Sequence, residues 1–258
     1  MIVFGAIAPH GGIILDGESP TRTAMEELGR RHAAAAPDAT IVITPHGVHL
    51  EGSFAVVTAA TVAGDLGGPD TRLSCPVDLG LAHAVVEALR EVGPAVGVSF
   101  GSNDPADAEM PMDWGTLIPL WFIGGRTNPQ TPVVVVSPAR AFSFEAHVRA
   151  GQALAEACGD RRVAVIASAD HGHAHESDGP YGFHPAAAEY DARVVELVRE
   201  NRLGDGVGLG TIVDLAKADS LWQLLMLHGA LGEGFDTHLL SYDVPTYFGM
   251  LCAAFEPR

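Results

Sequence analysis

The segment Val163–His175, with the sequence VAVIASADHGHAH, most constrains how this chain can fold. It begins with a run of small and β-branched apolar residues, which is typical of a buried strand. It ends in three histidines at alternate positions, His171, His173 and His175. Because the carboxyl ends of parallel strands open onto the crevice where α/β proteins bind ligands, the pattern predicts a functional site at the end of this strand.

Apolar runs of strand length alternate with helical patterns along the chain. We expect strands at Ile2–Ala8, Ala39–Thr44, Phe54–Ala59, Val96–Phe100, Pro132–Ser137, from Val163 onwards, and at Tyr247–Phe255. We expect helices from Pro20 towards Ala36 and over Asp78–Glu91, Phe144–Cys158, Ala186–Glu200 and Ser220–Leu231. This order predicts an α/β sandwich with a mostly parallel or mixed central sheet flanked by helices. No linker, charge block or repeat interrupts the sequence, so we expect a single domain over residues 1–258.

Composition excludes several classes of partner. The formal charge of −17 argues against nucleic acid and anionic membranes, because both require basic patches. The sequence has no apolar run of membrane-spanning length and no basic segment typical of a signal peptide. Its three cysteines are odd in number and lack CxxC spacing, which favours buried thiols over disulfides or a zinc knuckle. We therefore expect a cytoplasmic protein.

Two further predicted strands end in Pro-His-Gly, at His10 and His46. One histidine at a strand end is more often an ordinary loop residue than a ligand or catalyst. Histidines at the ends of three separate strands, however, would share one crevice in a parallel sheet. The pattern therefore favours metal binding or acid–base chemistry. Two histidines and one carboxylate with open positions is the arrangement of non-haem Fe(II) oxygenases.

Four motifs carry a resemblance that spans nearly the whole chain. They are APHGG at Ala8–Gly12, TPHG at Thr44–Gly47, SADHGH at Ser168–His173 and DSLWQLLMLHGAL at Asp219–Leu231. With them the chain resembles the class III extradiol ring-cleavage dioxygenases, the LigB-like family. The resemblance implies an Fe(II)-dependent enzyme that cleaves the ring of a catechol-type aromatic with O₂. It also implies that His10 and His46 bind the iron and that His173 is the catalytic acid–base.

The third metal ligand in that family is usually a glutamate from the region leading into the last motif. Here the nearest carboxylate is Asp219, with Asp214 as an alternative. A plain helix N-cap is an equally good interpretation of Asp219.

The resemblance also points to residues of a substrate pocket. Many relatives carry Asp-His-Gly where this chain has Asp-Trp-Gly at positions 113–115, which implies altered substrate recognition through Trp114. The alternative is a core tryptophan beside Leu117 and Leu120. Further pocket candidates are Asp170, His171, His175 and His184. A carboxylated catechol would require a nearby cation, for which Arg140 and Lys217 are closest in sequence.

Two other functions remain open at this stage. One is a non-catalytic, metal-binding interaction protein of the Memo-like type, although those proteins carry cysteine where the dioxygenases carry glutamate, and no cysteine falls there in this chain. The other is a zinc-dependent hydrolase, in which Zn²⁺ would activate water. Zinc could also replace iron in isolated protein. The resemblance further implies a homo-oligomer or pairing with a small second subunit.

Overall fold

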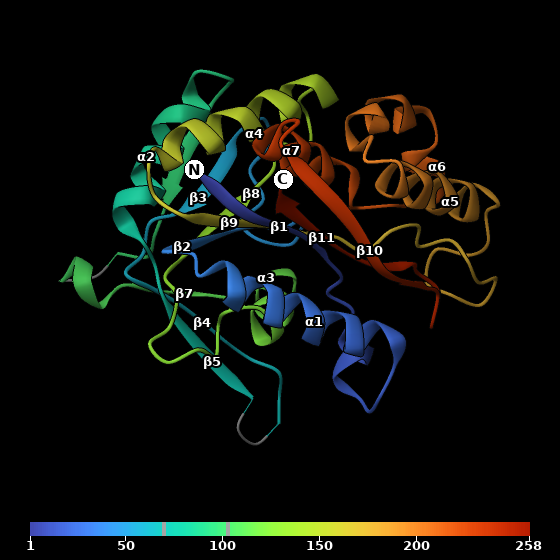
Figure 1. The fold of residues 1–258 in the computed structure, drawn as a ribbon, viewed down its shortest axis with the longest axis horizontal. Helices are drawn as coiled ribbons and strands as arrows, with labels where there is room; N and C mark the ends of the chain where they lie inside the picture. The colour runs from blue at the N-terminus through green and yellow to red at the C-terminus, as the bar shows by residue number, and fades with distance from the viewer. Residues whose placement is uncertain (69–70, 102–103) are drawn as a thin grey trace.

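A computed structural model describes residues 1–68, 71–101 and 104–258. Its main sheet is built from β1 (Ile2–Ala8), β2 (Ala39–Ile43), β3 (Phe54–Val57), β6 (Ala95–Val98), β8 (Val133–Ser137), β9 (Val163–Ser168), β10 (Phe235–Asp243) and β11 (Met250–Pro257). Within the described residues these eight strands lie in the order β10-β11-β1-β9-β2-β8-β3-β6 (Figure 1). The predicted α/β fold with a mixed central sheet is confirmed.

The middle of this sheet is parallel and its flanks contain antiparallel pairs. β9 lies between β1 and β2 and runs parallel to both, and β2 is also parallel to β8. β11 runs antiparallel to β1, and β3 antiparallel to β8. Every residue of β1, β2, β8 and β9 is buried, as expected for parallel strands covered on both faces.

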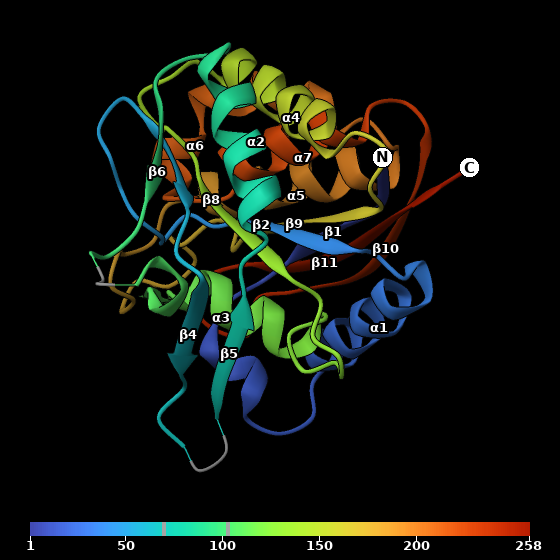
Figure 2. The ribbon, with the colours of Figure 1, turned by 90° about the vertical axis from the view of Figure 1, so that its left-hand side faces the viewer.

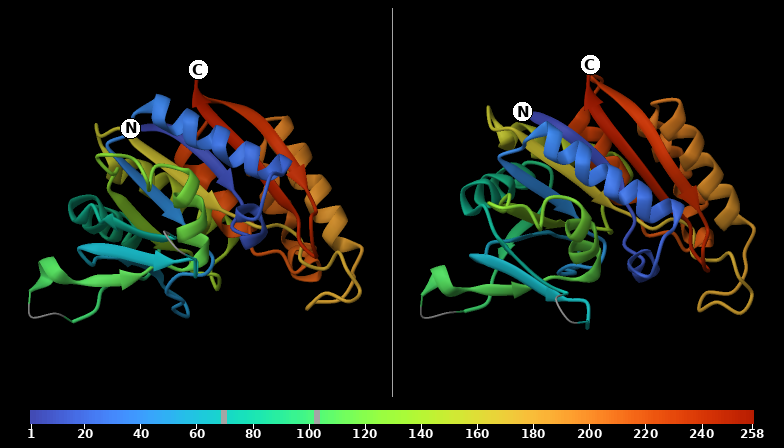
Figure 3. Two further views of the ribbon diagram at one scale, coloured as in Figure 1. Left: turned by 90° about the horizontal axis from the view of Figure 1, so that it is seen from below. Right: turned by 60° about the horizontal axis from the view of Figure 1, so that its bottom comes forward.

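Helices cover both faces of the sheet. On one face lie α2 (Leu79–Arg90), α4 (Phe144–Cys158) and α7 (Leu221–Leu231); on the other lie α1 (Pro20–Ala35) and α3 (Trp114–Phe122) (Figures 1 and 2). α5 (Ala186–Arg199) contacts β10 and α6 (Val213–Ala216). Short 3₁₀ segments occur at Gly12–Leu15, Pro105–Asp107 and Leu203–Thr211. A second, small sheet of β4 (Thr61–Asp65), β5 (Arg72–Pro76) and β7 (Glu109–Pro111) lies at the side of the molecule away from β10 (Figure 3).

The backbones of helices α4 and α7 approach each other closely at two glycines. A Cβ at Gly151 would collide with the carbonyl oxygen of Met226, and a Cβ at Gly229 with that of Val148. Only glycine permits such an approach. The close contact fixes α7 relative to α4, and the residues at the N-terminal end of α7 belong to the site described below.

The structure departs from the sequence-based expectations in several elements. The strands β4, β5, β7 and β10 were not expected, and the last strand begins later, at Met250. All three cysteines are buried and unpaired, as expected. Among the described residues, we find no helix whose length and apolar character would let it cross a membrane.

Candidate metal centre and active site

Three neighbouring strands deliver the three histidines that the sequence singled out. His10 follows β1, His46 follows β2, and His173 follows β9, which lies between them. In the sheet register, Ala167 of β9 pairs with both Ile7 of β1 and Ile43 of β2. The strands therefore end side by side at one edge of the sheet, as expected from a parallel arrangement.

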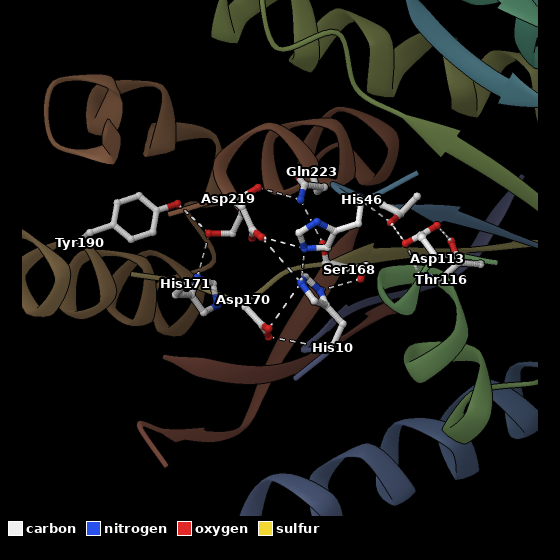
Figure 4. Close-up of polar contacts among 12 residues, drawn as sticks. His10, His46, Asp113, Thr116, Ser168, Asp170, His171, Tyr190, Asp219 and Gln223 are labelled. Carbon is white, nitrogen blue, oxygen red and sulfur yellow. Dashed lines mark hydrogen bonds and ion pairs between the residues drawn. The ribbon is translucent and has the colours of Figure 1, made fainter. Parts of the chain in front are cut away.

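His10, His46 and Asp219 point toward one another (Figure 4). The Nε2 atoms of the two histidines lie 3.0 Å apart. Asp219 Oδ2 lies 3.2 Å from His46 Nε2 and 3.7 Å from His10 Nε2. All three potential ligand atoms fall within 4.8 Å of one another.

These three side chains fit a divalent metal ion. Ligand atoms held about 2.1 Å from one ion and at right angles to each other would lie about 3 Å apart, close to the separations found here. The second carboxylate oxygen, Asp219 Oδ1, is buried and has no hydrogen-bond partner among the described residues. Two imidazoles and one carboxylate suit Fe(II) and also Zn²⁺.

His10 is fixed from two directions by residues at the end of β9. Its Nδ1 lies 2.9 Å from Ser168 Oγ, and its backbone N–H donates to Asp170 Oδ1 at 3.0 Å. The other oxygen, Asp170 Oδ2, is 3.4 Å from His10 Nε2. The pocket candidate Asp170 is thus a buried neighbour of the metal group.

His46 is held by a chain of hydrogen bonds that reaches α3. Its backbone N–H donates to Thr44 Oγ1 at 3.2 Å, and that hydroxyl donates to Asp113 Oδ1 at 2.6 Å. Asp113 also caps α3 by accepting from the N–H of Thr116 at 3.0 Å. The Trp114 ring lies 4.4 Å from the His46 ring, centre to centre, and Trp114 is 55% exposed. The interpretation of Trp114 as a core tryptophan is therefore wrong.

Asp219 lies just before α7 and does not cap it. The cap position is Ser220, and no side chain caps this helix end, so the N-cap interpretation of Asp219 is wrong. Its carboxylate turns instead to the two histidines. Gln223 Nε2 donates to the carbonyl oxygens of Asp219 and Ser168, at 2.8 and 3.1 Å. These two bonds hold the N-terminal end of α7 against the end of β9. The alternative ligand, Asp214, is exposed on α6 and lies outside the metal group.

The charges in this group are strongly coupled. Burial alone would lower the pKa of His10, but Asp170 and Asp219 outweigh it and raise the pKa to about 9. Burial would raise the pKa of the Asp219 carboxyl, yet hydrogen bonds from His10 and His46 hold it well below its usual range. For Asp170, burial dominates and raises the pKa of the carboxyl.

His173 lies among aromatic side chains. Its ring stacks on Phe248 at 5.2 Å between centres and 22° between planes. Tyr181 and Tyr247 approach the same ring at 5.8 and 6.0 Å. His173 Nδ1 is buried and has no hydrogen-bond partner among the described residues. Such an aromatic wall suits a flat aromatic ligand.

Comparison with known proteins agrees with this geometry. The model of the family described as the catalytic LigB subunit of aromatic ring-opening dioxygenase matches residues 7–252. The chain belongs to the LigB family.

Individual relatives of this LigB-family chain are distant. Protein CA_C1420 of Clostridium acetobutylicum is 22% identical over 231 residues, which cover 86% of this chain and 49% of that protein. The chain thus spans about half the length of this relative. The crystal structure of the uncharacterized protein JW3007 from Escherichia coli K12 superposes with a TM-score of 0.66 at 19% identity, covering 98% of this chain and 99% of the other. This second likeness concerns the fold.

The remaining histidine candidates have different surroundings. His171 is buried, and its Nδ1 lies 3.1 Å from Ser220 Oγ. His175 Nε2 lies 2.9 Å from Asp191 Oδ2. His184 Nδ1 accepts the N–H of Ala186 at 3.1 Å, at the start of α5. Sequence reasoning missed Asp191, Ser220 and Gln223, because each acts through a partner on another element.

A cavity of about 230 Å³ adjoins the metal group at His46. Most of its wall is apolar and comes from β3, β4, β7 and β8: Val57, Val62, Met110, Pro111 and Val135. None of the described residues that line it is lysine or arginine. Of the cations suggested by the sequence, Arg140 lies over the Trp222 ring at 4.9 Å and Lys217 is exposed.

Proposed function

We propose that this LigB-family chain is a non-haem Fe(II)-dependent extradiol dioxygenase that cleaves the ring of a catechol-type aromatic with O₂. The observation that carries the proposal is the convergence of His10 Nε2, His46 Nε2 and Asp219 Oδ2 within 4.8 Å. Membership of a family described by aromatic ring opening supports the same chemistry.

His10, His46 and Asp219 would hold the iron. When bound by such a set, Fe(II) supplies open positions for the two oxygens of a catechol and for O₂. Ser168 orients the His10 ring through its Nδ1, and Thr44 holds the His46 backbone through its N–H. Such outer partners commonly determine metal affinity as strongly as they determine ring orientation.

His173 would accept a proton from a catechol hydroxyl and later return it. Because its Nδ1 is buried, we assign this transfer to Nε2. The stacked Phe248 ring restricts how the imidazole can turn. Tyr181, Tyr247 and the exposed Trp114 would bind the flat substrate and displace water from it.

The test is oxygen consumption by protein loaded with Fe(II) under anaerobic conditions. A panel of catechol, alkylcatechols, protocatechuate, gallate and aminophenols should include a substrate that consumes one O₂ per ring opened and gains two ¹⁸O atoms from ¹⁸O₂. His173→Phe should keep the iron and retain only a small residual turnover, while His238→Gln, at a half-exposed site on β10, should match the wild type. If no member of the panel supports oxygen uptake by iron-loaded protein, the proposal is wrong.

Metal analysis separates this proposal from zinc-dependent hydrolysis. Protein isolated with zinc should gain oxygenase activity only after exchange to iron. Activity that required zinc and consumed no O₂ would instead favour the hydrolase.

A further inference from the structure

The segment that carries His173 is held by backbone hydrogen bonds after β9 ends. His171 N–H donates to the carbonyl oxygen of Gly249 at 2.8 Å, and Gly249 N–H donates to that of Gly172 at 3.1 Å. His173 N–H donates to the carbonyl oxygen of Ala216 at 2.8 Å. These bonds fix the path of the backbone but leave the histidine rings to be placed by other groups.

Asp191 of α5 contacts this segment on both sides of His173. Its Oδ1 accepts the N–H of Gly172 at 2.7 Å, directly before His173. Its Oδ2 lies 2.9 Å from Nε2 of His175, two positions after His173, and accepts the Tyr242 hydroxyl at 2.8 Å. A single carboxylate thus bridges the two flanks of the proposed acid–base residue.

The Asp191 carboxylate is buried and tightly packed. Asp191 is only 1% exposed, and a buried carboxylate is costly unless hydrogen bonds satisfy it. A Cβ at Gly249 would collide with its Oδ2, so the chain entering β11 passes directly against it. A residue with a side chain therefore has no room at position 249 beside this carboxylate.

The residue before Asp191, Tyr190, reaches the same segment at His171 through the Ser220 hydroxyl. The Tyr190 hydroxyl lies 2.9 Å from Ser220 Oγ, which in turn lies 3.1 Å from His171 Nδ1 (Figure 4). α5 therefore presents two consecutive buried polar side chains to the segment that contains His173. Neither belongs to the metal group.

We propose that Asp191 is a positioning residue for His173, holding the segment at Gly172 and at His175 so that the His173 ring keeps its place against Phe248. The inference rests on the proposed acid–base role of His173. Small displacements of a group that transfers a proton reduce turnover strongly, whereas they affect substrate affinity less.

Three variants test it in the full-length, iron-loaded protein. Asp191→Asn can still accept from Gly172 through its oxygen, but the amide nitrogen that replaces Oδ2 can accept from neither His175 nor Tyr242. His175→Ala removes only the contact after His173. Tyr242→Phe is the matched control, because it removes one donor to Asp191 and leaves the bonds to Gly172 and His175 in place.

We expect kcat to fall at least about tenfold in Asp191→Asn, with KM and the iron content nearly unchanged. Tyr242→Phe should retain kcat within about twofold. In the background of His173→Phe, Asp191→Asn should cause no further loss, because the residue that it positions is absent. A wild-type kcat in folded Asp191→Asn, or an equal further loss in the His173→Phe background, would overturn the inference. If Asp191→Asn does not fold, His175→Ala takes its place in the same comparison.

Failure of the proposed function would give a different result. In that case the wild type itself would show no oxygen uptake, and the ring proton resonances of His173 in NMR spectra would replace kcat as the readout. The chemical shifts of those resonances should differ from the wild type in Asp191→Asn and match it in Tyr242→Phe. Wild-type chemical shifts of His173 in Asp191→Asn would show that Asp191 does not position His173, whichever reaction the protein catalyses.

Discussion

His10 Nε2 and His46 Nε2 lie 3.0 Å apart, although the two residues are 36 positions apart in the chain, and the angle between their rings is 86°. Without a metal the raised pKa of His10 keeps that ring protonated, whereas two imidazoles that bind a metal ion must both be neutral. Asp219 approaches both nitrogens from a third element. The arrangement is one that a bound cation would stabilise, and this has consequences that can be measured.

Replacing Asp219 with asparagine should weaken the binding of Fe(II) or Zn²⁺ by at least about 100-fold, since loss of a ligand should exceed the 10–100-fold effect typical of its outer partners. Anaerobic metal titration with a competing chelator would measure it. Asp214→Asn removes the same charge from exposed α6 and should retain wild-type affinity. Equal losses in both variants would mean that net charge, and not ligation, controls metal binding.

Asp113 links the N-terminus of α3 to His46 through Thr44, so its loss should have two effects. Asp113→Ala should destabilise the protein by about 1–2 kcal/mol, the usual value of an N-cap, and also weaken metal binding. Asp113→Asn keeps an oxygen for Thr44 and for the N–H of Thr116 and should be much milder. Urea unfolding and metal titration of both variants provide the measurement, and equally severe effects would contradict the assignment.

The histidines could be predicted from the sequence because each follows a mostly apolar strand, and parallel packing brings the ends of such strands together. Asp219 could not be distinguished from a helix cap, since a carboxylate before a mostly apolar helical run fits either role. Only in the folded protein does the carboxylate of Asp219, before α7, lie beside His10 and His46. That arrangement depends on tertiary packing rather than on local pattern.

Other features were missed for related physical reasons. β10 is only partly buried and mixes polar with apolar residues, so its pattern lacks the apolar run by which the core strands were found. The alternation of His171, His173 and His175 suggested side chains on one face. Beyond Ser168, however, the backbone leaves the strand, and the three rings meet Ser220, Phe248 and Asp191 respectively.

Charge should govern the choice among catechols. None of the described residues lining the cavity beside His46 is lysine or arginine, Asp113 is one of them, and Asp170 and Asp219 lie in the adjoining metal group. A carboxylated ring would therefore meet an unfavourable potential. We expect kcat/KM for catechol or an alkylcatechol to exceed that for protocatechuate by at least about tenfold, measured by oxygen uptake at low ionic strength. A preference for protocatechuate would show that a cation reaches the substrate.

The close contact between α4 and α7 should not tolerate a methyl group. Gly151→Ala forces a Cβ against the carbonyl oxygen of Met226 and should cost about 1–3 kcal/mol of stability, the range found for overpacked cores. Gly80→Ala, on the exposed side of α2, meets only an ordinary contact with Asp78 and should be neutral or slightly stabilising. Chemical unfolding compares the two. If Gly151→Ala leaves the free energy of unfolding as little changed as Gly80→Ala does, α4 and α7 can move apart without cost.

Stability should fall in weak acid because of His32, a buried residue of α1. Its Nε2 lies 2.9 Å from Thr40 Oγ1, and burial lowers its pKa from 6.5 to about 4. The unfolded chain therefore binds this proton more tightly than the folded chain does. The contribution of neutral His32 is complete above about pH 6.5 and is lost as the pH falls toward 4, by about 3 kcal/mol in total.

Urea unfolding at several pH values between 7 and 4 would measure this loss by comparing the wild type with His32→Gln. The advantage of the wild type over the variant should shrink by that amount as the pH falls, because glutamine does not titrate. His83→Gln, at an exposed position of α2, should follow the wild-type curve throughout. A constant difference between the wild type and His32→Gln would show that His32 takes up its proton without unfolding, for example by turning its ring toward solvent past Gly124, whose backbone lies against it.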